Sequence, residues 1–484
     1  MKRILKYLGV LLLLLLAVMF VKTLFTGSLQ PNISYTGSGK ADPGAANRLA
    51  EALRFQTISG ENNSQDSLKQ AELVKLYAWM QQAYPSVFKQ ATVTVIGDSR
   101  LIEITGKDPK LLPALMLAHL DVVPADTGVT GSWKFPPFSG TVDKDTIYGR
   151  GALDDKSVAT AMLEALEQLL KQGKTPNRSV LLAFGHDEEI GGKEGAKKIA
   201  EYLISKNKKA AFICDEGFGL MENLVPGVDK DVALIGIAEK GFVSAELTVD
   251  IPGGHSSMPK KDNATAILAK GLNAVENTTF LETLCEPQES FFRHIAPEAS
   301  PLYRYLFSNL WITSPAVKMV LRGNNKTAAT MGTTHATTII QAGDKDNVMP
   351  GRARAVINFR ILPGQRIADV KQLLIEALDD PRISVRLLPD QTEPSGVSPD
   401  EGPAWDAIVK AVHQTYKEVV TAPALVIAGT DCKHYTAISP NIYRFVPLRF
   451  NSQNLDGIHG SDEKIALRNY EEAIGYYRVL FTTM

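Results

Sequence analysis

Cysteine is scarce in this sequence. The 484-residue chain has only Cys214, Cys285 and Cys432, which lie far apart. This spacing excludes a disulfide scaffold and a cysteine-rich zinc module. Any metal ion would therefore have to be held by histidine and carboxylate side chains.

An excess of either charge is also lacking. Lysine and arginine number 52, and aspartate and glutamate 53, so the formal net charge is −1. We therefore expect no nucleic-acid partner, because such a partner is bound by a basic surface. The hydrophobic fraction of 44% is ordinary for a globular protein. The length is too great for one simple core and predicts two domains.

The long hydrophobic run stands at the N-terminus. A basic start is followed by the almost purely apolar residues 7–21 and then by Lys22. A spanning helix needs about 20 apolar residues, whereas a cleaved signal ends in a small-residue cleavage site. No clean Ala-x-Ala site follows, so we favour a membrane anchor over residues 1–27, with a signal peptide and secretion as the alternative. Because the basic residues come first, the body should lie outside the cytoplasm. Residues 28–44, rich in Gly, Ser, Pro and Asn, predict a linker.

After the linker, apolar runs alternate with segments of helical spacing. The runs at 111–118, 179–184 and 210–214 suit buried strands, and residues 157–170 and 195–206 suit the helices between them. This alternation predicts an α/β fold with a central, mostly parallel sheet flanked by helices.

A second domain is expected inside the first. From residue 243 the apolar residues alternate strictly, which is typical of a strand with one wet face. We expect a smaller α+β lid over 243–397, inserted between catalytic segments 45–242 and 398–484. The aromatic-rich segment 280–321 is interpreted as a helical addition to the lid, serving as lid core or subunit contact. A minority hypothesis makes it an acyl pocket.

Histidines and acids stand at the ends of the expected strands. Ligands of open α/β sheets bind beyond the carboxyl ends of the strands, and two histidines with three carboxylates suit two zinc ions and a bridging carboxylate. Cobalt or manganese are possible substitutes. The candidate ligands are His119, Asp154, Glu189, Asp215 and His459.

Two further acids have expected catalytic roles. Asp121 lies two residues after His119 and would orient that ring. Two metal ions about 3.5–4 Å apart can deprotonate a shared water and polarise a carbonyl. Glu188, next to a ligand but aimed differently, is the natural general base for that water.

Six short runs carry a family resemblance. They are HLDVVP at 119–124, GRGALDDK at 149–156, HDEEIGG at 186–192, CDEG at 214–217, GGHSS at 253–257 and GIHG at 457–460. In order and spacing the chain resembles the M20 family of metallopeptidases and amidohydrolases. Within it, the chain looks most like the branch of carboxypeptidase S and the N-fatty-acyl-amino-acid synthase/hydrolases.

The resemblance implies a di-zinc catalytic domain and an inserted lid of the dimerisation type, so a homodimer through the lid is possible. It implies that Asp154 bridges the metals and is joined to Asp155 by a cis peptide bond. The other expected ligands are His119 and Asp215 for one zinc ion, and Glu189 and His459 for the other.

Substrate contacts are also implied by the resemblance. His255 would stabilise the tetrahedral oxyanion, and Arg360 would receive the substrate carboxylate with its guanidinium fork. Asn347 would bind substrate, and Gly429 and Thr430 lie in a loop near the same carboxylate.

The expected reaction is hydrolysis of an amide next to a free carboxylate, in a peptide losing its C-terminal residue or in an N-acyl amino acid. The alternatives are an aminopeptidase or di/tripeptidase of the same family, or a catalytically silent binding protein.

Overall fold

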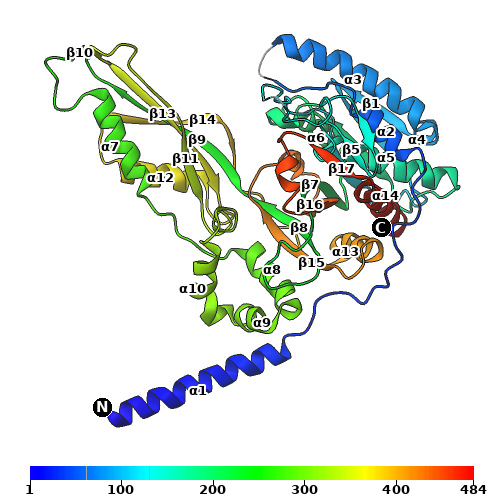
Figure 1. The fold of residues 1–484 in the computed structure, drawn as a ribbon, viewed down its shortest axis with the longest axis horizontal. Helices are drawn as coiled ribbons and strands as arrows, with labels where there is room; N and C mark the ends of the chain where they lie inside the picture. The colour runs from blue at the N-terminus through cyan, green and yellow to red at the C-terminus, as the bar shows by residue number, and fades with distance from the viewer. Residues whose placement is uncertain (61–62, 130) are drawn as a thin grey trace.

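The chain folds around two sheets, each with its own hydrophobic core (Figure 1). The computed structural model describes residues 1–60, 63–129 and 131–484. A helix projects from the molecule at the N-terminus, and the C-terminus lies against the larger sheet's helices.

The larger sheet has eight strands in the order β1-β2-β6-β3-β7-β16-β8-β15. Pairing is parallel from β6 through β3 and β7 to β16, and again between β8 and β15. It is antiparallel among β1, β2 and β6 and between β16 and β8. The strands are β1 Thr92–Ile96, β2 Ser99–Ile104, β3 Ala114–His119, β6 Val180–Gly185, β7 Phe212–Met221, β8 Val232–Glu239, β15 Val420–Val426 and β16 Ile442–Phe450.

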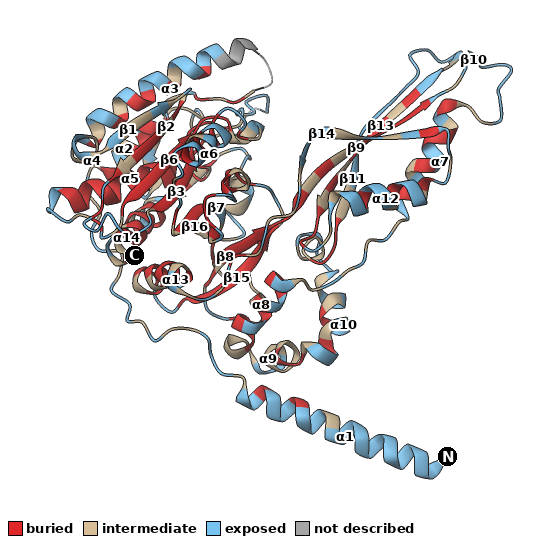
Figure 2. Cartoon of the chain, turned by 180° about the vertical axis from the view of Figure 1, so that it is seen from behind, coloured by how far each residue is buried: buried red, intermediate tan, exposed pale blue. Residues whose placement is uncertain are grey.

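Helices cover both faces of this sheet, so its central strands are buried throughout (Figure 2). Parallel strands covered on both faces are apolar along their whole length, which explains the unbroken hydrophobic runs. The α/β class with a mostly parallel sheet is thereby confirmed. One face carries α2 Ala45–Ala52, α3 Asn63–Ala83, α4 Pro85–Gln90, α5 Lys156–Lys171, α13 Pro403–Thr415 and α14 Leu467–Thr483, and the other carries α6 Ala196–Ser205.

The smaller sheet lies in the segment expected to be the lid, has the order β11-β13-β9-β14, and all its pairs are antiparallel. Alternate residues of β9, such as Val243 and Leu247, are fully buried against two helices. At the far tip, β10 Gly254–His255 pairs with β12 Val348–Met349. The lid elements are β9 Gly241–Asp250, β11 Thr334–Ala342, β13 Arg352–Ile361, β14 Ile383–Thr392, α7 Ala264–Glu276 and α12 Ile367–Leu378.

A run of short helices lies between elements of the smaller sheet in sequence. It comprises α8 Glu286–Ile295, α9 Pro301–Ser308, α10 Leu310–Leu321 and α11 Asn325–Ala328. Its first members, α8 and α9, pack on the larger sheet. Ile295 and Phe291 pack with Val420 and Ala422 of β15. We had expected this segment to be an addition to the lid, but Phe291 and Phe307 pack instead with β15, the edge strand of the larger sheet.

The N-terminal helix α1 Lys2–Phe25 has 24 residues, and only 6% of its most apolar window is buried. It is long and apolar enough to cross a membrane. The segment after it has no helix or strand up to α2, and it follows the catalytic domain through hydrogen bonds of Gln30 with Thr421 and of Thr36 with Gln414.

Candidate metal centre

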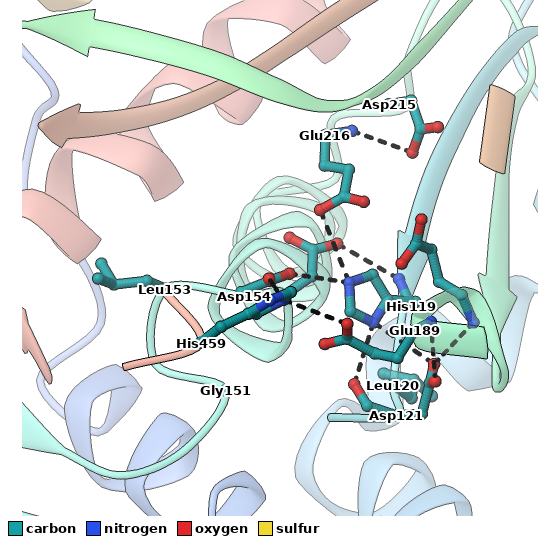
Figure 3. Close-up of polar contacts among 12 residues, drawn as sticks. His119, Leu120, Asp121, Gly151, Leu153, Asp154, Glu189, Asp215, Glu216 and His459 are labelled. Atoms are coloured by element: carbon teal, nitrogen blue, oxygen red, sulfur yellow. Dashed lines mark hydrogen bonds and ion pairs between the residues drawn. The ribbon is translucent and has the colours of Figure 1, made fainter. Parts of the chain in front are cut away.

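His119 is the last residue of β3 and is almost fully buried. Its Nδ1 lies 3.0 Å from the backbone oxygen of Asp121. Because a carbonyl oxygen only accepts, Nδ1 carries the proton and donates it to Asp121, which leaves the Nε2 lone pair free. This Nε2 lies 2.9 Å from Oδ1 of Asp154, so the ring is aimed at the carboxylates (Figure 3).

Asp154 stands between two groups of candidate ligands. Its Oδ2 lies 3.0 Å from Nε2 of His459, which is also 3.2 Å from Oε2 of Glu189. Each group of three offers donor atoms within 4.8 Å of one another. The two groups, which share Asp154, are His119–Asp154–Glu216 and Asp154–Glu189–His459. A carboxylate with one oxygen in each group is the arrangement that bridges two neighbouring cations.

The acidic pair at 215–216 departs from the sequence-based expectation. Asp215 accepts hydrogen bonds from the backbone N–H of Glu216 and of Cys432, at 3.0 and 2.7 Å. Both its oxygens therefore face backbone donors. Glu216, which we had not proposed, places Oε2 3.6 Å from Nε2 of His119. Neighbouring residues of a strand point to opposite faces, so the doublet itself signals two candidates.

The charges at this site fit divalent cations. Burial, together with repulsion from Asp154, raises the pKa of Glu216 to about 8. Hydrogen bonds to Asp154 and Glu189 raise the pKa of His459 to about 10. Without a cation these groups must share protons to lie so close together, and a bound metal replaces those protons. Imidazole nitrogens with carboxylates are a donor set that zinc favours.

Asp121 contacts both the expected base, Glu188, and the candidate ligand Glu189. Its two carboxylate oxygens accept the backbone N–H groups of Glu188 and Glu189, at 3.2 and 3.3 Å. The same carboxylate lies 3.4 Å from Nδ1 of His119. Glu188 is partly buried. Burial first, and then the nearby carboxylate of Glu216, raises the pKa of Glu188 well above its ordinary value.

A buried ion pair clamps two ligand loops to each other. Arg150 and Glu463 are joined at 2.6 Å, and their side chains are 2% and 0% exposed. Arg150 also donates to the carbonyl of Gly460, beside His459, at 3.0 Å. The carboxylate of Glu463 accepts the backbone N–H groups of Gly151, Leu153 and Asp154. Sequence analysis missed this pair, because its members lie 313 residues apart.

The expected substrate residues are only partly gathered at the site. Thr430, after β15, donates to Glu239 at 3.1 Å, and Gly429 precedes it in the same loop. Arg360 lies in β13 with its guanidinium 4.9 Å from the ring centre of Phe242. His255 in β10 and the exposed Asn347 belong to the lid tip, away from the metal ligands (Figure 1).

The Asp154–Asp155 peptide bond is cis, as the resemblance implied. The model of Peptidase family M20/M25/M40 matches residues 115–483. Among curated relatives, "Probable carboxypeptidase S-like 2" of Dictyostelium discoideum is 38% identical over 436 residues, covering 89% of this chain and 83% of the relative. The N-fatty-acyl-amino acid synthase/hydrolase PM20D1 of Mus musculus is 35% identical, covering 88% and 85%.

Solved structures share the fold. The M20 family metallo-carboxypeptidase Sso-CP2 of Sulfolobus solfataricus has a TM-score of 0.66 and 22% identity, covering 91% of this chain and 99% of that one. Human carnosine dipeptidase 1 has a TM-score of 0.61 and 18% identity, covering 90% and 95%.

Proposed function

The chain belongs to Peptidase family M20/M25/M40 and is a metal-dependent peptidase or amidohydrolase, and we propose that it cleaves an amide bond adjacent to a free carboxylate. The substrate is either a peptide losing its C-terminal residue or an N-acyl amino acid. The names of its relatives support this choice, since they describe carboxypeptidases and N-fatty-acyl-amino acid hydrolases.

The observation that carries the proposal is the carboxylate of Asp154 shared between two ligand groups. Our assignment gives one cation to His119, Asp154 and Glu216, and the other to Asp154, Glu189 and His459. The ions are zinc, with cobalt or manganese as substitutes. We had expected Asp215 in the place of Glu216. We now favour Glu216, because its carboxylate faces His119 while that of Asp215 faces backbone N–H groups.

The chain's own groups then divide the chemistry. When bound, the two cations lower the pKa of a water between them and polarise the substrate carbonyl. Glu188 takes the proton of that water on a carboxylate oxygen and passes it to the leaving nitrogen. Asp121 holds the ring of His119 and the turn that carries Glu188 in position through its three contacts. Burial of these groups excludes bulk water from the proton transfer.

The lid supplies the substrate contacts in this proposal. Arg360 receives the free carboxylate, with the Gly429–Thr430 loop beside it, while Asn347 binds substrate and His255 supports the oxyanion. Because His255 and Asn347 lie at the lid tip, they reach the substrate only when the lid closes or when a second copy supplies them. A homodimer through the lid would provide the second route.

We place the catalytic body outside the cytoplasm, anchored by α1. The support is a helix of 24 residues that is long and apolar enough to span a membrane and is scarcely buried. Secretion after removal of this segment is the alternative. Recovery of the intact N-terminus from membranes distinguishes the two.

The decisive test is a hydrolysis panel of N-blocked dipeptides and N-fatty-acyl amino acids, with zinc added and removed. We expect metal-dependent cleavage of substrates whose carboxylate is free and no cleavage of their methyl esters. Exclusive use of substrates with a free amino group would instead identify an aminopeptidase or di/tripeptidase.

The role of the base is tested by Glu188→Gln, which keeps the side-chain shape but cannot take a proton. We expect turnover to fall by about 10²–10⁴-fold while two metal ions per chain remain bound. Glu194→Gln, a nearby acid outside the ligand groups, is the matched control and should retain activity. Full activity in Glu188→Gln would contradict its role as the base. If the metal-loaded protein, altered or not, cleaved none of the substrates, the proposed function would be wrong.

A further inference from the structure

The helix α10 faces outward with its apolar side. Its exposed residues are Trp311, Ile312, Pro315, Ala316, Met319 and Val320, whereas Thr313 and Val317 are buried. A surface helix of a globular protein normally turns its polar face to water. The exposed fractions of 56% for Trp311, 69% for Met319 and 67% for Val320 show that this face is unusually apolar. Leu302, at the start of the neighbouring helix α9, is also 66% exposed.

The helices α9 and α10 lie on the side of the molecule from which α1 projects (Figure 1). Asn309, between α9 and α10, donates to the backbone oxygen of Met19 at 3.2 Å and contacts Thr23 at 3.0 Å. Tyr305 contacts the sulfur of Met19. The ammonium of Lys22 lies 6.0 Å from the ring centre of Trp311.

These contacts set the depth of α10 in a bilayer. A helix of 24 residues is about 36 Å long, while the hydrocarbon core is about 30 Å thick. Lys22 is three residues before the end of α1, about 4–5 Å along its axis. If α1 spans, the ring of Trp311 beside Lys22 therefore lies close to the level where hydrocarbon meets headgroups. Trp and a snorkelling Lys are the side chains expected there.

We propose that α10, with the start of α9, inserts its apolar face into the outer surface of the phospholipid bilayer and so seats the catalytic domain on the membrane. This rests on the proposed anchoring by α1. The seat is joined to the site through packed helices. Thr313 of α10 donates to the backbone oxygen of Leu306 in α9, Phe307 of α9 packs on Phe292 of α8, and α8 packs on β15, the strand that leads into the Gly429–Thr430 loop. The catalytic domain would thus be held at a set height on the membrane.

The first test uses the full chain in phosphatidylcholine vesicles whose acyl chains carry bromine, a quencher of tryptophan fluorescence. Co-flotation is measured first. Trp311 is one of four tryptophans, so we expect quenching of up to about a quarter of the emission, and its loss in Trp311→Phe, which keeps an apolar ring. Co-flotation without quenching overturns the seat and leaves the anchor standing. Failure to co-float overturns both, while hydrolysis in detergent still reports separately on the proposed reaction.

A second measurement does not depend on tryptophan. Met319→Cys is compared with Met258→Cys, a similarly exposed methionine on the lid (74%). On vesicles, a water-borne maleimide should label Met319→Cys about tenfold more slowly than Met258→Cys, because a thiol at the acyl boundary is out of reach. Equal labelling rates of the two cysteines on vesicles overturn the proposal. Slow labelling of both cysteines without vesicles or detergent would also overturn it, because it would indicate that the protein associates with itself and not with a bilayer.

Discussion

The clamp between Arg150 and Glu463 makes a sharp prediction. In Glu463→Gln the side-chain shape is kept, but the charge is removed and an amide N–H₂ replaces one acceptor oxygen. In either orientation the new N–H₂ group faces other hydrogen-bond donors. One carboxylate oxygen of Glu463 faces Arg150 and Gly151, and the other faces the N–H groups of Leu153 and Asp154. The guanidinium of Arg150, whose side chain is 2% exposed, is left without its partner.

The magnitude follows from this burial. Removing one member of a buried ion pair costs about 3–5 kcal/mol in the free energy of unfolding. Because the clamp holds the Asp154 loop against the loop of His459, metal affinity should also fall, by about 10–100-fold as for other groups that support metal ligands. Equilibrium unfolding of the metal-free protein and zinc titration against a competing chelator measure the two effects separately.

Glu472→Gln is the matched control. Glu472 pairs with Arg449 at 2.5 Å in a partly buried network, where Arg449 keeps Asp231 at 2.8 Å and Glu222 at 3.1 Å. We expect a smaller loss of stability, about 1–3 kcal/mol, and unchanged zinc affinity. If Glu463→Gln bound both ions as tightly as the unaltered chain, the clamp would have no role in positioning the ligands.

Three further predictions concern the ligands, the metal and pH. Glu216→Gln should release one of the two ions while Asp215→Asn retains both, as measured by metal content after dialysis; the reverse result would return the ligand role to Asp215. Zinc at about 100 times its dissociation constant should stabilise the metal-free protein by about 2.7 kcal/mol, and His459→Ala should reduce that gain; an unaltered gain would place the ion elsewhere. Burial lowers the pKa of His413 to about 4, so the unfolded chain takes up this proton first as the pH falls. The free energy of unfolding should therefore be unaffected by this histidine above pH 6.5 and should fall between pH 6.5 and 4, by about 3 kcal/mol at most. Denaturant unfolding should show a smaller loss of stability over this pH range in His413→Gln. Equal losses in both proteins would exclude His413 as the cause.

The gathering of His119, Asp154, Glu189 and His459 was predictable because parallel strands bring their carboxyl ends to one edge of a sheet. His119 ends β3, and the Glu188–Glu189 turn follows β6, its neighbour in the sheet. Asp154 stands before α5, where a carboxylate is favoured. That Glu216 rather than Asp215 turns toward His119 was not predictable, because it depends on which face of β7 lies on that side.

The helical segment α8–α10 was misplaced for a related reason. Its aromatic residues indicate burial, but their spacing does not indicate the partner surface. Phe291 packs toward β15, which lies more than a hundred residues later in the chain. The sequence likewise does not show that α10 turns apolar residues outward, because this depends on which of its residues the neighbouring helices cover.

By itself the sequence determined the class of sheet, the histidines and carboxylates at the candidate site and the apolar N-terminal helix, because each depends on periodicities and strand ends that are local. Tertiary structure decided the Arg150–Glu463 clamp, the orientation of Glu216 and the position of α10 beside α1. These depend on which distant segments pack together, and that is set by the fit of side chains across the whole core.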